Sequence, residues 1–174
     1  ATDGGMSIAG EMTYRKDEPL QIDDVELLFA TLEPIGQIPS GTSQIPGGAG
    51  LGDEISGYRL LDTVQLQTTF TKFMGPTWGA DQWVVLVEVG ANMILDMPSQ
   101  DELRFEAPGT FRSGNPDRNP TVANPTLEGQ TENKFADDFS WGYRAILRGE
   151  YNNALGNWNL NPRLQWFHDV DGVT

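Results

Sequence analysis

The sequence predicts an all-β protein: an antiparallel, up-and-down segment of a transmembrane β-barrel, with about five long strands, two long loops and one short loop helix. Three observations support this fold class. Apolar and polar residues alternate with a period of two over unusually long stretches. The connections between these stretches are alternately long and short, and aromatic residues gather near the ends of the stretches.

The alternating stretches are the predicted strands, and they lie at residues 6–14, 58–73, 83–95, 139–151 and 158–169. They exceed the usual globular strand of about 5–6 residues, whereas a tilted strand crossing a bilayer needs about 9–11 residues. Long loops are expected at 15–57 and 96–138, and short turns at 74–82 and 152–157. Short turns on one side and long extracellular loops on the other are typical of outer-membrane barrels.

The run FSWGYRAILRGEY (139–151) has two different faces. One face is aromatic and apolar, and the other carries Arg144, Arg148 and Glu150. We expect the apolar face to meet lipid and the polar face to line the interior, where it could orient an anionic headgroup or set an ion preference. The candidate ligand-binding, lumen-lining residues are Glu88, Asn92, Arg144, Arg148, Glu150, Arg163 and Gln165. The alternative is a network of paired charges that fills the barrel and binds no ligand.

Large aromatic side chains form two predicted girdles at the membrane interfaces. Amphipathic rings prefer the level of the lipid headgroups, whereas in a soluble sandwich they tend to lie in the middle of a strand. The predicted membrane-interface residues are Tyr14, Tyr58, Trp83, Phe139, Trp141, Tyr151, Trp158 and Trp166.

Two features count against the prediction of a membrane barrel. Pro162 lies inside the last run, where a proline removes a ladder hydrogen bond, so a bulge is expected at residues 161–162. Five strands are also fewer than the eight or so with which bacterial barrels begin. We therefore expect residues 1–174 to be a single segment, internal or C-terminal, of one larger barrel domain.

Residues 23–32 (DDVELLFATL) form the convincing helix of the sequence. Val25, Leu28, Phe29 and Leu32 make a stripe at helical spacing, and Pro34 ends the segment. Asp23 is expected to cap the helix, with Glu26 completing a capping box. The helix would either pack its stripe on the barrel rim or fold into the mouth as a gate.

The net charge of −14 argues against nucleic acid as a partner, because phosphate binding needs a basic surface. The two long loops carry 11 of these net negative charges, and could gather divalent cations loosely. DVDG (169–172) matches only the first half of a calcium loop, so a turn is the better explanation. The sequence predicts no catalytic residues, no cofactor and no defined metal site, and it has no cysteine.

Several segments resemble a known family. These are GEMTYRKDEPLQI (10–22), FTKFMGPTWGADQWVVLVEVGA (70–91), DELRFEAPGT (101–110) and the C-terminal 135–174, whose SWGYR, EYNNALG, NLNPRL and HDVDG motifs are the most specific. They are similar to proteobacterial outer-membrane proteins called domain of unknown function 1302.

The resemblance implies an outer-membrane barrel of a Gram-negative bacterium that passes or exports hydrophobic or amphipathic small molecules. It also implies kinship with fatty-acid-type channels and association with periplasmic components and inner-membrane pumps of the resistance-nodulation-division kind. Partners would then include outer-membrane lipid, lipopolysaccharide and the hydrophobic cargo, and no nucleic acid.

Two other readings stay open. A soluble β-sheet domain could bind a ligand or a glycan, using its tryptophans as stacking platforms. An outer-membrane enzyme with its active site in the loops would need a catalytic cluster that the sequence does not show.

Overall fold

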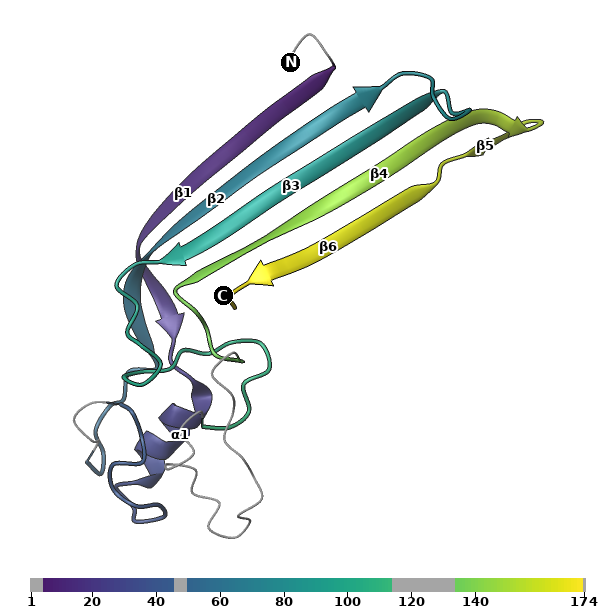
Figure 1. The fold of residues 1–174 in the computed structure, drawn as a ribbon. Coiled ribbons are helices and arrows are strands. Elements are labelled where there is room, and N and C mark those ends of the chain that lie inside the picture. The colour runs from purple at the N-terminus through teal and green to yellow at the C-terminus, as the bar shows by residue number, and fades with distance from the viewer. Residues whose placement is uncertain (1–4, 46–49, 114–133, 174) are drawn as a thin grey trace. The chain divides into compact units, whose positions relative to one another are not determined.

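The structure, a computed structural model, describes residues 5–45, 50–113 and 134–173. The described residues form six strands and one short helix, in the order β1 (Met6–Gln21), α1 (Asp24–Leu32), β2 (Tyr58–Met74), β3 (Gln82–Ile94), β4 (Phe139–Leu155), β5 (Trp158–Leu160) and β6 (Arg163–Asp171). The strands make one antiparallel sheet, with neighbours in the order β1-β2-β3-β4-β5 and with β6 also paired to β4 (Figure 1). The all-β antiparallel prediction is confirmed, and the sheet is not closed into a barrel.

Three of the predicted strands differ from the structure. Strand β4 continues through Leu155 instead of ending at residue 151, so most of the turn predicted at 152–157 is strand. The first strand continues through Gln21 instead of ending at residue 14, so the segment 15–21 is not part of a loop. Its charges and Pro19 hide the alternation in the sequence. Pro19 is tolerated because β1 is an edge strand, where a missing N–H costs less than it would in the middle of the sheet.

The last predicted strand is divided into β5 and β6 by residues 161–162, which gives six strands instead of five. Pro162 lies in this interruption, as its missing N–H requires, and its carbonyl oxygen still accepts a 3.0 Å hydrogen bond from the Gly149 amide. The expectation of an irregularity at Pro162 is therefore confirmed. The sheet continues beyond it with β6 against β4.

The chain folds as two compact units. The sheet unit comprises Ala1–Tyr14, Val64–Met93 and Ser140–Asp171, and the helix–loop unit comprises Arg15–Thr63, Ile94–Phe139 and Gly172–Thr174.

Almost all buried apolar side chains belong to the helix–loop unit. Its core is formed by Ile22, Leu103, Phe105, Ala107 and Ala136, and Phe29, Ala30 and Phe135 are buried as well. In the described part of the sheet unit, Ala80 is the one buried apolar side chain. The helix–loop unit thus has a conventional core, whereas the described part of the sheet unit is a single layer without one.

Helix α1 differs from its prediction on two points. Its buried residues are Glu26, Phe29 and Ala30, whereas Leu28 of the predicted apolar stripe is 52% exposed. Asp23 holds the N-cap position but makes no capping hydrogen bond through its side chain, so the predicted capping box is wrong. The Asp24 amide instead donates to Glu106 Oε2 at 3.0 Å, so the first turn is capped by a distant loop residue.

Among the described residues, no helix is both long enough and apolar enough to cross a membrane.

Candidate functional site

The strand register separates the two faces of β4 and β6. Residues directly opposite each other in an antiparallel pair point to the same side of the sheet. Leu147 pairs with Leu164 and Ala145 with Trp166, which makes one face apolar. On the other face Arg148 pairs with Arg163, and Ile146 with Gln165.

The polar face continues onto β2 and β3. Arg144 forms an ion pair with Glu88, and the Thr69 hydroxyl donates to Glu88 Oε2 at 3.3 Å. By alternation, Leu66 and Phe70 of β2 then lie on the apolar side.

The structure brings most of the predicted lumen-lining residues onto this polar face. Arg148 Nη2 lies 3.0 Å from Glu150 Oε1 in a second ion pair. With its amide oriented toward Arg163, the Gln165 oxygen accepts from Arg163 Nε at 2.7 Å. Asn92 follows Glu88 by four residues on β3 and is exposed. Three guanidinium groups and two carboxylates thus share one face, and the observed pairing is what a charge network requires.

Two of the predicted interface aromatics meet at the turn between β2 and β3. Trp83 packs edge-to-face against Trp78, at 5.6 Å between ring centroids, and against Tyr151 at 6.1 Å. Trp83 Nε1 donates to the Thr77 carbonyl, and the Tyr151 hydroxyl to that of Trp78. Apolar rings whose polar atoms bind turn carbonyls suit a boundary between apolar and aqueous surroundings.

The position of the Trp83 ring also explains why residue 149 is a glycine. A Cβ atom on Gly149 would come within 2.9 Å of the Trp83 ring, so the ring covers the β4 backbone where a side chain would otherwise stand. The other predicted interface aromatics, which are exposed in the structure, are Tyr14, Tyr58, Phe139, Trp141, Trp158 and Trp166.

A second group of polar residues lies inside the helix–loop unit. Glu26 is fully buried, and its Oε1 lies 3.7 Å from Arg104 Nη1. Its Oε2 accepts a 2.7 Å hydrogen bond from the backbone N–H of Gln44, and the Ser113 hydroxyl donates to Oε1 at 3.3 Å. Gln44, Arg104 and Ser113 from the loops therefore all contact the Glu26 carboxylate of α1, and together these residues form a buried polar cluster.

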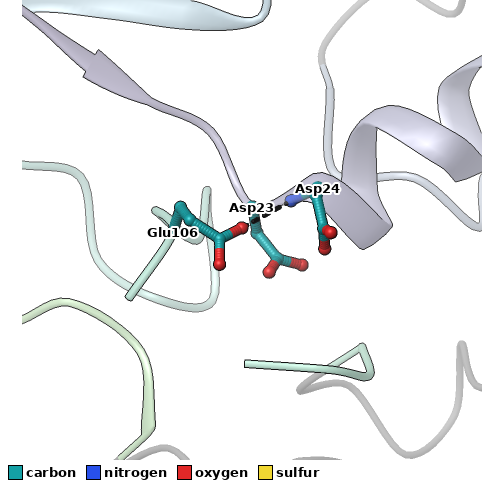
Figure 2. A group of neighbouring side chains, drawn as sticks. All are labelled: Asp23, Asp24 and Glu106. Carbon is teal, nitrogen blue, oxygen red and sulfur yellow. Dashed lines mark hydrogen bonds between the residues drawn. The ribbon is translucent and has the colours of Figure 1, made fainter. Parts of the chain in front are cut away.

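Beside this polar cluster, three acidic side chains lie together: Asp23, Asp24 and Glu106. One oxygen of each lies within 4.8 Å of the others, and the Asp23 carboxylate stands between the other two (Figure 2). Burial, together with the nearby carboxylates of Glu106 and Asp24, raises the pKa of Asp23 to about 7. No sequence pattern indicated this group, because Glu106 is 82 residues away from Asp24.

Backbone pairing holds these acidic residues in place. Ile22 and Phe105 form an antiparallel bridge, the Asp23 amide donates to the Arg104 carbonyl at 3.0 Å, and the Glu106 amide donates to the Gln21 carbonyl at 3.0 Å. Ile22 and Phe105 are core residues, so burial of their side chains stabilises the pairing.

The motif DVDG contributes no part of this group. Asp169 and Asp171 belong to the exposed strand β6, and Gly172 follows with a positive φ of 76°. Most of the motif is therefore strand instead of the predicted turn, and the strand ends before a glycine whose positive φ an L side chain rarely adopts.

Comparison with known proteins gave one family. Neither the curated proteins nor the solved structures contained a match to the chain. The model of the family described as "Protein of unknown function (DUF1302)" matches residues 1–174, which is the whole chain. This agrees with the resemblance seen in the sequence motifs, and the chain belongs to the DUF1302 family.

Proposed function

We propose that the sheet unit forms part of the wall of an outer-membrane β-barrel, and that this barrel passes hydrophobic or amphipathic small molecules. The observation that carries the proposal is the apolar face without a core. Met12, Leu164 and Trp166 are 69%, 68% and 60% exposed. A sheet in water has to bury such a face against a second layer, whereas a barrel in a bilayer presents it to lipid.

The opposite face supports the same proposal. Arg144 and Glu88 form one ion pair there, and Arg148 and Glu150 form another. Charged residues on one face and exposed apolar residues on the other are the alternation expected between a barrel lumen and lipid. Strands of 13 to 17 residues in β2, β3 and β4 are long enough to cross the bilayer with a tilt.

The proposal is tested by locating the full-length protein. After expression in a Gram-negative host, we expect it in the detergent-extracted outer membrane, with a folded form that migrates differently on a gel before and after heating. Recovery as a soluble periplasmic monomer would refute membrane insertion.

The transport role needs its own measurement. Proteoliposomes that contain the full-length protein should take up a fluorescent amphipathic fatty-acid analogue faster than empty liposomes do. Replacing Arg148 by Gln removes a guanidinium next to Glu150 and Arg163 without changing the apolar face. An unchanged uptake rate in Arg148→Gln would indicate that these charges fill the barrel without contacting the cargo.

Exposed tryptophans favour one alternative, a soluble domain that binds glycans. Trp158 is 77% exposed, and Trp166 presents its ring on the apolar face. Saturable binding of the soluble protein to a glycan array, lost on Trp158→Ala and Trp166→Ala, would favour this alternative over the barrel.

A further inference from the structure

Asp23 is in an unusual environment for a carboxylate. Its side chain is fully buried, and neither Oδ1 nor Oδ2 has a hydrogen-bond partner among the residues that the structure describes. Buried polar atoms normally have partners, and a buried carboxylate without one is costly unless it is protonated or bound to a cation.

The surroundings of Asp23 add negative charge. Asp24 and Glu106 each place an oxygen within 4.8 Å of it and of each other. Within the described residues, none of the three carboxylates forms an ion pair with a lysine or arginine, and the nearby Arg104 pairs with Glu26 instead. The positive end of the α1 dipole favours acids near Asp24, but it is only a partial charge and does not neutralise three carboxylates.

We propose that Asp23, Asp24 and Glu106 bind a divalent cation, for which Ca²⁺ is the best fit. The ligands would be carboxylate oxygens only, which suit a hard cation. Calcium binds oxygen at 2.3–2.6 Å, so two oxygens on one ion are at most about 5 Å apart, and the observed 4.8 Å limit satisfies this.

The site combines a rigid frame with access for the ion. Glu106 is held by two hydrogen bonds, to Oε2 from the Asp24 amide and to Oε1 from the Thr110 hydroxyl at 2.6 Å. Each carboxylate oxygen keeps a further lone pair for a metal. Asp24 is exposed, so water can complete the coordination shell that calcium needs.

A bound ion would fasten two segments that are far apart in the sequence. Asp23 and Asp24 belong to the start of α1, and Glu106 follows the bridge residue Phe105. The ion would neutralise the repulsion between them and stabilise the helix–loop unit. This site lies wholly within that unit, so it can exist whether or not the sheet unit crosses a membrane.

The test uses full-length protein refolded in detergent without lipopolysaccharide, because lipopolysaccharide itself binds divalent cations. Isothermal titration with calcium chloride should show one saturable site with a Kd on the order of 10⁻⁴ M, typical of extracellular modules. Calcium at about 100 times Kd should shift the folding equilibrium of the unit about 100-fold. Magnesium chloride, as a second probe, should bind more weakly.

Asp23→Asn is the decisive variant, since it keeps the size of the side chain and removes its charge. It should lower calcium affinity at least about tenfold, and it should fold as well as the wild type because it removes a buried charge. If Asp23→Asn does not fold, Asp24→Asn is used in its place, because Asp24 is an exposed ligand. The matched control is Glu102→Gln, an exposed acid in the same unit but outside the cluster, which should bind calcium like the wild type.

Three results would overturn the proposal. The first is no saturable calcium binding by the wild type. The second is unchanged binding in both Asp23→Asn and Asp24→Asn. The third is an equal loss in Glu102→Gln, which would mean that the acidic loops attract calcium diffusely.

Discussion

Replacing Leu147 by Lys tests which face of the sheet meets lipid. Leu147 is the central residue of β4, eight residues from Phe139 and eight from Leu155. At about 3.3 Å per residue and a tilt of about 40°, eight residues rise roughly 20 Å along the membrane normal. The apolar band is about 25 Å tall, so β4 extends beyond both of its edges. With the strand centred on the band, its central residue Leu147 would lie near the bilayer midplane.

The expected cost of Leu147→Lys follows from that depth. A lysine on the lipid face at the midplane costs about 2–4 kcal/mol, which lowers the folding equilibrium constant about 30- to 700-fold. Ile146 is the matched control, because it is the neighbouring apolar residue and pairs with Gln165 on the opposite face. Ile146→Lys adds a like charge between Arg144 and Arg148, which costs less than about 1 kcal/mol on a wet face.

The assay is the yield of heat-modifiable protein in the outer membrane, with urea unfolding in detergent to give the free-energy difference. Assembly should fail for Leu147→Lys and survive for Ile146→Lys. The reverse result would mean that the faces are assigned wrongly, and tolerance of both variants would mean that neither face is in lipid.

A third variant at the same position separates lipid from a protein core. Leu147→Trp should be tolerated in lipid, which adapts to a larger side chain. In a packed core the same change should cost about 1–3 kcal/mol through overpacking. A destabilisation of that size, together with failure of Leu147→Lys, would favour the soluble alternative.

Three further predictions concern individual contacts. Arg104→Met leaves the Glu26 carboxylate buried without its ion partner, so hydrogen exchange of α1 should show about 3–5 kcal/mol of destabilisation; wild-type protection would contradict this. Gly149→Val should displace the Trp83 ring and change its fluorescence, and an unchanged spectrum would argue against the contact. Because the folded-state pKa of Asp23, about 7, lies above its ordinary 3.8, the folded state binds that proton more tightly. Metal-free protein should therefore lose stability as the pH rises from about 4 through 7, and Asp23→Asn should remove this component from urea unfolding curves; an unchanged pH dependence would oppose the raised pKa.

The sequence alone determined most of the strands and the helix. Alternation with a period of two is a local property, so it located β2, β3 and β4. It also distinguished the apolar face from the polar face on both β4 and β6. It failed at residues 15–21, where charges and Pro19 interrupt the alternation although the strand continues. There the pairing with a neighbouring strand, which no local pattern records, decides the structure.

The tertiary structure alone decided what surrounds each acidic side chain. The sequence predicted a capping box of Asp23 and Glu26, and it assigned no role to Glu106 in the long loop. In the structure Glu26 is buried with Arg104, whereas Glu106 caps α1 and lies beside Asp23, whose carboxylate has no hydrogen-bond partner in the described part of the chain. Contacts across 82 residues depend on how the loops pack around Ile22 and Phe105, and only the folded chain brings them together.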